Sequence, residues 1–305
     1  MPNHKVKLIV NPSADLGRAW RWASDLHPVV EEFGGADWSG TVYPTHATEL
    51  ARQAAEEGHE LVIAVGGDGA THEVINGLIQ VPPDRRPRLG LVPLGSGNDF
   101  AFAMGMNKIP ILALRQVLTG KPRRVDVGLL RDNLGHTEYF NNTLGIGFDA
   151  TVTIRSRNLP FVRGFMMYLL AVLQTIALNH DPMRLQVSSD QETWEDVMLM
   201  FVICNGAREG GGFTVAPDAR LDDGIFHYAA VQRVSRLMML RLVPEVMRGT
   251  HGRFRQVRMG QFQKISITSD RPLYIHTDGE IYAGFGMDLR QLTVENIPGA
   301  LEIMV

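Results

Sequence analysis

The sequence predicts two domains, an α/β domain with a parallel sheet followed by a domain of mostly antiparallel strands. In residues 5–101, short apolar runs alternate with loops and helical patterns, which is typical of a parallel sheet with helices on both faces. From residue 123 the pattern changes to short strand candidates separated by turns. A chain of 305 residues has ample length for two domains. We place them at residues 1–124 and 125–297, and expect the apolar residues 298–305 to return to the first domain.

The elements of the first domain follow from its apolar runs. Residues 61–65 are few, apolar and β-branched, which predicts a buried strand that the next glycines end. After Ala70, apolar side chains recur at helical spacing, with Gly77 as the one weak point. The same criteria predict strands at 5–10, 41–44 and 88–93, and helices around Trp20 and Trp22, at 47–57, and from Phe100.

The second domain is predicted from short apolar segments that turns separate. Helical insertions interrupt them at residues 159–179 and 235–248. The strand candidates lie in RRVDVGLL, EYFNNTLGIGFDATV, RLQVSSD, DVMLMFVICNG, GIFHYAAV, KISITSD, LYIHTDGE and MDLRQLTVENI.

The loop after residues 61–65 has the composition of an anion-binding turn. Gly66, Gly67 and Gly69 carry no β-carbon, so backbone N–H groups can close around a phosphate at the start of the next helix. Asp68 would repel that phosphate unless it faced a metal ion or a proton to be moved, which makes it a candidate catalytic residue. The alternative is a glycine turn with an Asx-type hydrogen bond from Asp68. The loop matches neither G-x-x-x-x-G-K-[ST] nor G-x-G-x-x-G.

Four loops of the first domain occupy equivalent positions in the predicted sheet. They begin near Asn11, Thr41, Gly66 and Gly95, each after a predicted strand. Ligands of parallel α/β sheets bind beyond the carboxyl ends of the strands. We therefore expect these loops to converge on one site.

Composition excludes several classes of function. The net charge of -3 and a pI near 6.4 give no general attraction to nucleic acid. Cys204 is the only cysteine, which excludes an internal disulfide and a cysteine-based zinc site, and it fits a buried strand in a reducing cytoplasm. The N-terminus lacks the apolar run of a signal peptide. The apolar stretch 165–178 is too short to span a bilayer and contains Gln174, so we expect an intracellular protein.

Five motifs resemble the diacylglycerol kinase catalytic family, in particular its bacterial lipid kinases related to sphingosine kinases. They are NPSADLG at 11–17, GGDGATHEVINGL at 66–78, PLGSGNDFA at 93–101, GGGFTVAPDARLDDG at 210–224 and DGE at 278–280. The resemblance covers nearly the whole chain, and the order of the motifs is that of the family. Ala70 and Ser96 stand where the family usually has threonine, and Thr45 replaces a frequent glycine. The loss of one hydroxyl at Ala70 alters the expected phosphate contacts.

This resemblance implies an NAD-kinase-like nucleotide-binding domain, a C-terminal antiparallel β-sandwich, ATP as phosphate donor and Mg²⁺ as cofactor. It also implies which residues bind the nucleotide. These are Asn11, Pro12, Ser13, Gly17, Thr41, Gly66, Gly67, Asp68, Gly69, Ala70, Thr71, His72, Ser96 and Asn98.

Acidic residues supply the predicted metal ligands. Asp68, Asp99 and Asp126 lie on converging loops and suit Mg²⁺, which prefers oxygen ligands. Asp99 could equally be a helix cap, and Asp126 a turn residue. A second, structural Mg²⁺ site is implied by the resemblance at Asp223, with the backbone carbonyls of Arg220 and Ile225, although RLDDGIF is also an ordinary turn sequence.

The DGE motif supplies the predicted general base. By resemblance Glu280 accepts the proton of the acceptor hydroxyl, and Asp278 supports it. The residues alone favour an exposed turn between two strands. The ten histidines, among them His276, show no metal-ligand spacing, and we expect most to be surface residues or ordinary polar contacts.

Access to a lipid is expected from two segments. Residues 161–178 form either a lid or groove wall, or a helix packed on the sandwich, with Phe165 and Tyr168 on one face. Residues 241–258 hold five arginines against one glutamate, Glu245, which favours either anionic headgroups or a solvated helix face. We therefore expect a cytoplasmic protein that is peripheral at the inner face of the membrane, and a homodimer is left open.

The leading hypothesis is an ATP- and Mg²⁺-dependent lipid kinase that phosphorylates a lipid alcohol such as diacylglycerol or a sphingoid base. One alternative is a kinase of a soluble acceptor such as NAD, since NAD kinases share the GGDG loop. Another is a nucleotide- or lipid-binding regulator without catalysis, which the loss of a hydroxyl at Ala70 motivates. The sequence does not distinguish among lipid acceptors.

Overall fold

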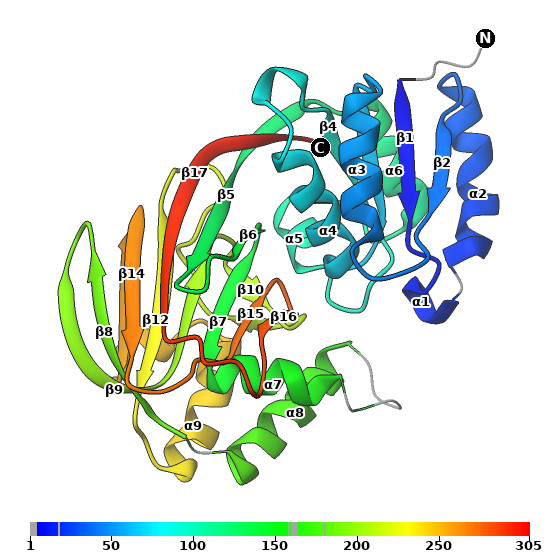
Figure 1. Cartoon of the computed structure of the whole chain (residues 1–305). Helices are drawn as coiled ribbons and strands as arrows, with labels where there is room; N and C mark the ends of the chain where they lie inside the picture. Colours follow the sequence, from blue (N-terminus) through cyan, green and yellow to red (C-terminus); the bar gives the residue numbers. More distant parts are fainter. Residues whose placement is uncertain (1–4, 18, 158, 160–163, 180) are drawn as a thin grey trace. The chain divides into compact units, whose positions relative to one another are not determined.

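The computed structural model describes residues 5–17, 19–157, 159, 164–179 and 181–305, and its contacts divide the chain into two compact units (Figure 1). Unit 1 comprises Met1–Val127 and Pro298–Val305, and unit 2 comprises Gly128–Ile297. The chain leaves unit 1 within strand β5 and returns within strand β17. The apolar C-terminal residues therefore share a compact unit with the N-terminal half.

Unit 1 is built on a parallel sheet with the strand order β2-β1-β3-β4-β17. Helix α3 packs against α4, and α2 against α6 (Figure 1). Strand β3 is buried from Val62 to Gly66, as expected for a parallel strand covered on both faces. The elements are β1 (Val6–Val10), α1 (Ala14–Gly17), α2 (Ala19–Glu32), β2 (Asp37–Gly40), α3 (His46–Glu56), β3 (Leu61–Gly66), α4 (Asp68–Ile79), η1 (Pro83–Arg85), β4 (Arg88–Pro93), α5 (Asp99–Ala103), α6 (Pro110–Thr119), β5 (Pro122–Asp132) and the end of β17 (Gln291–Met304).

The contact between α3 and α4 explains two residues that look unfavourable in the sequence. A β-carbon on Gly77 would lie 2.3 Å from the carbonyl oxygen of Thr48, so only glycine allows the two helices to approach this closely. Thr45 has a φ of 70°, a left-handed conformation that β-branched residues disfavour. Its backbone N–H donates to Glu73 of α4 at 2.9 Å, which helps to hold this conformation.

Several sequence predictions about elements need correction. The second strand lies at Asp37–Gly40 and not at 41–44, because its partly exposed side chains give no apolar run that would mark it. Residues 148–152 begin a helix and do not continue a strand, since Gly147 turns the chain with a φ of 78°. Helix α6 and strand β13 were not predicted.

Unit 2 is organised around the antiparallel strand β9. Along its length β9 pairs with β7, β8 and β12, and β7 in turn pairs with β15. The elements are the end of β5, β6 (Thr137–Phe140), β7 (Thr143–Gly147), α7 (Phe148–Ser156), α8 (Gly164–Leu178), β8 (Met183–Ser189), β9 (Thr193–Cys204), β10 (Arg208–Glu209), β11 (Phe213–Thr214), β12 (Phe226–Gln232), α9 (Arg236–Met247), η2 (His251–Arg253), β13 (Val257–Phe262), β14 (Lys264–Ser269), β15 (Ile275–Thr277), β16 (Glu280–Ala283) and most of β17.

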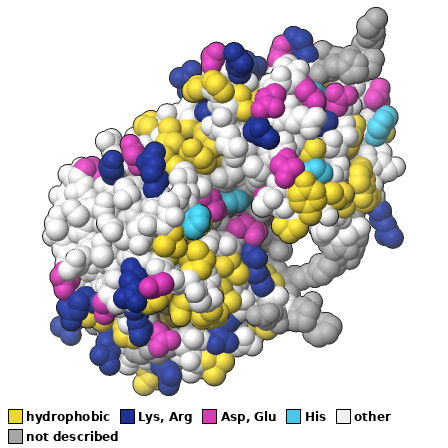
Figure 2. Space-filling model, viewed as in Figure 1, with side chains coloured by type: hydrophobic (Ala, Val, Ile, Leu, Met, Phe, Trp, Pro, Cys, Tyr) yellow, Lys and Arg dark blue, Asp and Glu magenta, His cyan; other side chains and the backbone are white. Residues whose placement is uncertain are grey.

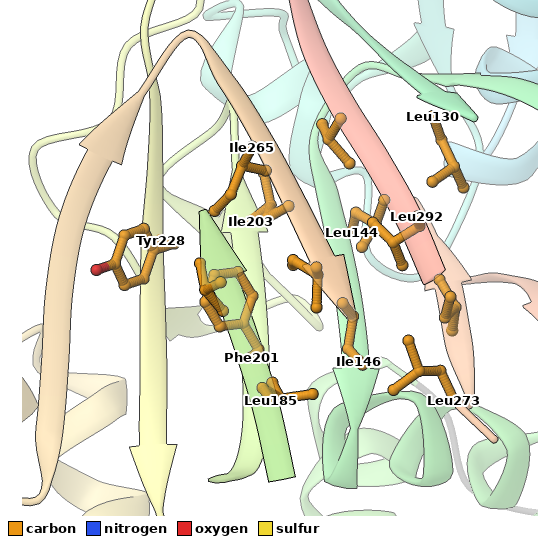
Figure 3. Close-up of a cluster of buried hydrophobic side chains, with 14 of the residues drawn as sticks. Leu130, Leu144, Ile146, Leu185, Phe201, Ile203, Tyr228, Ile265, Leu273 and Leu292 are labelled. Carbon is orange, nitrogen blue, oxygen red and sulfur yellow. The ribbon is translucent and has the colours of Figure 1, made fainter. Parts of the chain in front are cut away.

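Two apolar clusters stabilise unit 2. The first lies among the strands, where alternate side chains point inward, as the labelled residues Leu144, Ile146 and Leu292 do (Figure 3). The second lies between β9, β12 and the helices, and includes Val172 of α8 and Leu242 of α9. Unit 2 is thus a strand core with a second apolar layer under α7, α8 and α9.

Helix α8 packs on this second cluster through the predicted face. Val172 is buried, and Phe165, Tyr168 and Leu169 are partly buried against the cluster. Phe161, the predicted start of the lid or groove wall, lies outside the described residues. Among the described residues, no helix combines the length and the apolar character needed to cross a membrane.

Candidate functional site

The two glycine loops of unit 1 meet at the carboxyl ends of β3 and β4. A β-carbon on Gly67 would lie 2.9 Å from the Cα atom of Gly95, and one on Gly95 would lie 2.5 Å from the Cα atom of Gly67. The N–H of Leu94 donates to the carbonyl of Gly66 at 2.7 Å. The predicted convergence of these loops therefore depends on glycine at both positions, because any side chain would separate the backbones.

The first glycine loop opens directly into helix α4. Gly67 is the N-cap residue and Asp68 begins the helix, so the backbone N–H groups of its first turn lie beside the loop. Gly66 is also constrained, since a β-carbon there would lie 2.6 Å from the methyl carbon of Ala70. Thr71 and His72 are buried in this helix. Backbone N–H groups at the start of α4 can bind a phosphate here, and the methyl group of Ala70 lies against Gly66.

The loop near Asn11 lies against the same edge. The side-chain oxygen of Asn11 accepts the N–H of Ser13 at 3.0 Å, and the backbone N–H of Asn11 donates to Val65 at the end of β3. Thr41 donates its N–H to Val10, and so lies directly beyond β1 and β2. Pro12 and Gly17 belong to the same loop and the short helix α1. The nucleotide-binding roles of these residues stay predictions.

The carboxylates of Asp68 and Asp99 both lie close to Gly97. A β-carbon on Gly97 would lie 2.8 Å from one carboxylate oxygen of Asp68 and 3.3 Å from one of Asp99. The other Asp68 oxygen accepts the N–H of Phe100 at 3.4 Å. Two carboxylates around one glycine suit a hard cation such as Mg²⁺, so these residues fit the predicted cofactor.

The remaining residues of this group have backbone partners. Asn98 has a φ of 51°, and its side chain makes two hydrogen bonds to Gly95, which close the loop around the exposed Ser96. Asp126 is buried and accepts the N–H of Gly299 at 2.8 Å. The ligand atoms of Asp68, Asp99 and Asp126 do not form a group within 4.8 Å of one another in the described part of the chain. A role for all three in one metal site stays a prediction.

The DGE motif forms a tight hairpin turn in unit 2. Thr277 of β15 pairs with Glu280 of β16, and Asp278 and Gly279 between them have φ values of 52° and 83°. Positive φ at both central residues is the geometry that Asp-Gly favours in two-residue hairpins. The predicted turn between two strands is therefore confirmed, but it is not fully exposed, because Asp278 is buried.

The two acids of this turn have different surroundings. The buried carboxylate of Asp278 accepts the backbone N–H groups of Asn141, Asn142 and Thr143 at 3.0, 2.8 and 3.1 Å. Glu280 is partly exposed and forms an ion pair with Arg157, which also donates to the carbonyl of Gly279 at 3.1 Å. Asp278 thus fixes the turn, while Glu280 presents a carboxylate that solvent or a ligand can reach.

The predicted structural metal site at Asp223 is a turn in this structure. One carboxylate oxygen of Asp223 accepts the N–H of Ile225 at 3.1 Å, which is an Asx-type turn. The side chain of Arg220 faces Asp222, at 3.5 Å. The carbonyls of Arg220 and Ile225 stay predicted ligands.

Unit 2 contains a buried polar cluster that no sequence pattern predicted. Asp149 of α7, Glu209 of β10 and His276 of β15 are buried, and their ligand atoms lie within 4.8 Å of one another. Nε2 of His276 lies 2.7 Å from Asp149, and the hydroxyl of Tyr168 donates to the other Asp149 oxygen at 3.0 Å. His276 is thus buried among acids and is not a surface histidine.

Burial and polar neighbours act together on the pKa values of this cluster. Burial alone would raise the pKa of Asp149, but the imidazole of His276, with the Tyr168 hydroxyl and Glu209, lowers it below its usual value. Burial and the neighbouring carboxylates raise the pKa of Tyr168 well above its usual value. Asp149 is therefore an ionised acceptor at neutral pH, and Tyr168 remains a donor. Burial likewise raises the pKa of the Cys204 thiol, as expected of an unreactive strand cysteine.

An apolar pocket opens beside this cluster. It has an empty volume of about 600 Å³, open solvent included, and lies among α7, α8, α9 and strands β9 and β12. Its walls include Val172, Ile176, Leu242 and Val246, and its polar groups include Asp149, Glu209 and Tyr168. Such a lining suits an apolar group that carries a small polar group.

Comparisons with known proteins match both units. A model described as the diacylglycerol kinase catalytic domain matches residues 5–130, and one described as the YegS C-terminal NAD kinase β-sandwich-like domain matches residues 142–305. The fold class is thus a kinase-type α/β domain joined to an antiparallel β-sandwich, as predicted. The chain belongs to the diacylglycerol kinase family of lipid kinases.

Individual relatives agree with this assignment. A Chromohalobacter salexigens protein described as a probable lipid kinase, YegS-like, is 34% identical over 76% of this chain and 73% of its own. A Bacillus subtilis diacylglycerol kinase is 28% identical over 92% of this chain and 90% of its own. A Bacillus anthracis crystal structure described as a diacylglycerol kinase has a TM-score of 0.73 at 19% identity, and covers 99% of this chain and 96% of its own. A second from that organism has a TM-score of 0.80 at 22% identity, and covers 99% and 95%. The structures show the fold alone.

Proposed function

We propose that this protein transfers the γ-phosphate of ATP to the hydroxyl of a lipid alcohol, such as a diacylglycerol or a sphingoid base. The apolar pocket of unit 2 carries this proposal. The apolar end of an acyl or alkyl chain can contact its walls, and its few polar groups can contact a hydroxyl-bearing headgroup. A soluble acceptor such as NAD would gain little from walls such as Ile176 and Leu242, so the pocket favours the lipid over the soluble acceptor.

In the proposed reaction each part of the chain has a separate task. The loop at Gly66–Gly69 and the first turn of α4 would bind the phosphates through backbone N–H groups. Asp68 and Asp99 would hold Mg²⁺, which when bound neutralises charge on the phosphate oxygens. Glu280 would accept the proton of the lipid hydroxyl as its oxygen bonds to the γ-phosphorus, and the bond from that phosphorus to the departing ADP breaks.

The direct test is transfer of labelled γ-phosphate from ATP to lipid alcohols in mixed micelles with Mg²⁺. The acceptor panel includes diacylglycerol, a sphingoid base and NAD. Label that moves into the organic phase supports a lipid kinase, and label in NAD alone supports a kinase of a soluble acceptor. ATP binding without transfer to any acceptor would support a non-catalytic regulator.

Replacing Asp68 by asparagine is expected to lower kcat by at least about 100-fold, because Asn keeps the shape but loses the charge that holds the metal. Binding of ATP in the absence of Mg²⁺ should change little, because the backbone cradle is retained. Calorimetric titration with ATP, with and without Mg²⁺, separates the two effects. Asp84→Asn, an exposed acid of unit 1, is the matched control. An equal loss of kcat in both variants, or no loss of kcat in Asp68→Asn, would contradict the assignment of Asp68 as a metal ligand.

We also propose that the enzyme acts at the inner face of the membrane, through a surface made by α8 and α9. Exposed apolar side chains on these helices include Met166, Leu173, Leu237 and Leu240. Lys and Arg side chains lie among hydrophobic ones where Figure 1 places the two helices (Figure 2). Such a mixture suits an anionic bilayer, which attracts basic residues near its surface.

Several arginines of the predicted basic segment have internal partners, which guides the choice of variants. Arg258 pairs with Glu192 and lies over Trp194, while Arg241 and Arg253 lie over the ring of Phe254. The exposed Arg248, which directly follows α9, and Arg255, which follows η2, are better targets within this basic segment, since their replacement spares these contacts.

Charge reversal at Arg248 and Arg255 is expected to weaken binding to vesicles that contain phosphatidylglycerol by about 30-fold or more, at ~1 kcal/mol for each arginine. Sedimentation with sucrose-loaded vesicles measures the partition. The double variant Arg52→Glu/Arg85→Glu changes the charge of unit 1 by the same amount and should bind like the unchanged protein. Equal weakening in both would indicate a general charge effect and would rule out this surface.

A further inference from the structure

The turn that carries Glu280 is held on its inner side by a buried histidine. The N–H of Gly279 donates to Nδ1 of His276 at 3.3 Å, and Nε2 of the same ring lies 2.7 Å from Asp149. Since Nδ1 lies where it accepts the N–H of Gly279, we assign the ring proton to Nε2, which faces Asp149. His276 therefore connects the backbone of the turn to a buried carboxylate.

Asp149 is itself fixed on two sides. Its second oxygen accepts the hydroxyl of Tyr168 at 3.0 Å, and Tyr168 packs its ring against Gly210. Asp149 and Tyr168 also line the apolar pocket. A chain of hydrogen bonds thus runs from the wall of the pocket to the backbone of Gly279.

The space for this chain depends on Gly145 of β7. Leu144 and Ile146 point into the strand core (Figure 3), so position 145 faces the other side of the strand. A β-carbon on Gly145 would lie 1.9 Å from the Asp149 oxygen and 2.3 Å from Nε2 of His276. The φ of Gly145 is not in the left-handed region, so glycine is needed here for space and not for conformation.

We propose that His276, oriented by Asp149 and Tyr168, is a positioning residue for the turn of Glu280. The inference rests on the proposed function, since it assigns to the network the task of holding the general base. Arg157 holds the outer side of the same turn through the Gly279 carbonyl and Glu280. Asp149 and Tyr168 also line the apolar pocket, so the network connects the wall of the pocket to the turn of Glu280.

Two substitutions at position 276 distinguish a role in positioning the turn of Glu280 from a role in the stability of the protein. In His276→Asn, the side-chain oxygen lies near the place of Nδ1 and can still accept the N–H of Gly279. In His276→Gln, the amide nitrogen reaches toward Asp149, but the acceptor for Gly279 is lost. We expect His276→Gln to lower kcat for the lipid acceptor about 10- to 100-fold, because small displacements of a catalytic group have effects of this size. The KM for ATP should be unchanged, and His276→Asn should recover most of kcat.

Hydrogen exchange at the Gly279 amide supplies a readout that does not need activity. It should be faster in His276→Gln and in Gly145→Ala than in the unchanged protein, and restored in His276→Asn. Normal kcat and normal Gly279 protection in His276→Gln would overturn the proposal. Parallel losses of kcat and melting temperature in both His276 variants would also overturn it. So would a stoichiometric metal ion that is found in the purified protein and is lost in Asp149→Asn. If the unchanged protein transfers phosphate to no lipid while Gly279 exchange responds as expected, the proposed function fails but the hydrogen-bond network stands.

Discussion

Glu280→Gln is expected to lower kcat for a lipid acceptor by about 10²- to 10⁴-fold, the range over which a positioned general base contributes. Glutamine keeps the shape of the side chain and can still accept a hydrogen bond from Arg157, but it cannot take the hydroxyl proton at neutral pH. Folding should change little, because the ion pair with Arg157 is partly exposed and such pairs contribute roughly 0–1 kcal/mol. Steady-state kinetics with saturating lipid, together with a binding titration for ATP, measures both quantities.

Glu295→Gln is the matched control for this experiment. Glu295 also lies on a strand of unit 2, is similarly exposed and pairs with Arg131 and Lys264. Its replacement should leave kcat unchanged. If Glu280→Gln also retained full turnover, Glu280 would not be the base and the assignment taken from the DGE motif would be wrong.

Asp278→Ala is expected to destabilise unit 2 by about 3–5 kcal/mol. The change leaves the N–H groups of Asn141, Asn142 and Thr143 without their acceptor, and each unsatisfied donor costs about 1–3 kcal/mol. Alanine also disfavours the positive φ of this position. Urea unfolding, followed by circular dichroism and by hydrogen exchange of residues 141–143, measures the effect.

Asp278→Asn tests whether hydrogen bonding or charge matters at this position. Asparagine tolerates a left-handed backbone and keeps one acceptor oxygen for the N–H groups of Asn142 and Thr143, so part of the stability should return, although its NH2 group cannot accept the N–H of Asn141. Activity should follow stability in both variants, because Asp278 acts through the turn. Loss of turnover in a fully stable Asp278→Asn would instead indicate a direct role in the reaction.

Local sequence patterns were enough to predict the main strands, loops and helices of unit 1. The buried strand at β3 and the glycines after it are contiguous in sequence, so strand, loop and helix start could be recognised together. The same residues predicted that the Gly66 and Gly95 loops converge, and Gly67 and Gly95 do meet. Edge strand β2 was missed because its sequence, DWSG, lacks an apolar run, and its pairing with β1 becomes evident only in the sheet.

Helix α6 could have been predicted from its own residues. Pro110 is at its start, and the buried Ala113, Leu114 and Val117 have helical spacing. Helix α7 was harder to predict, because the apolar residues after Gly147 continue the composition of strand β7. The signal available in the sequence was Gly147 followed by Asp149, an acid in the first turn of the helix.

The buried polar network of unit 2 was beyond local patterns. Asp149 and His276 are 127 positions apart in sequence, and they meet because β7 pairs with β15 in the register that places Gly145 opposite His276. The pairing of Glu280 with Arg157 likewise joins residues 123 positions apart. Only the turn itself, marked by Asp-Gly, could be predicted from neighbouring residues.

Transfer of labelled γ-phosphate to a lipid alcohol tests the central claim most directly. The unchanged protein, Glu280→Gln and Glu295→Gln are compared in mixed micelles that contain diacylglycerol or a sphingoid base, with and without Mg²⁺. A lipid kinase gives extractable label that requires ATP and Mg²⁺, falls by about 10²- to 10⁴-fold in Glu280→Gln and is unchanged in Glu295→Gln. The absence of lipid-bound label under all these conditions, with label in NAD or in no acceptor, would contradict the claim.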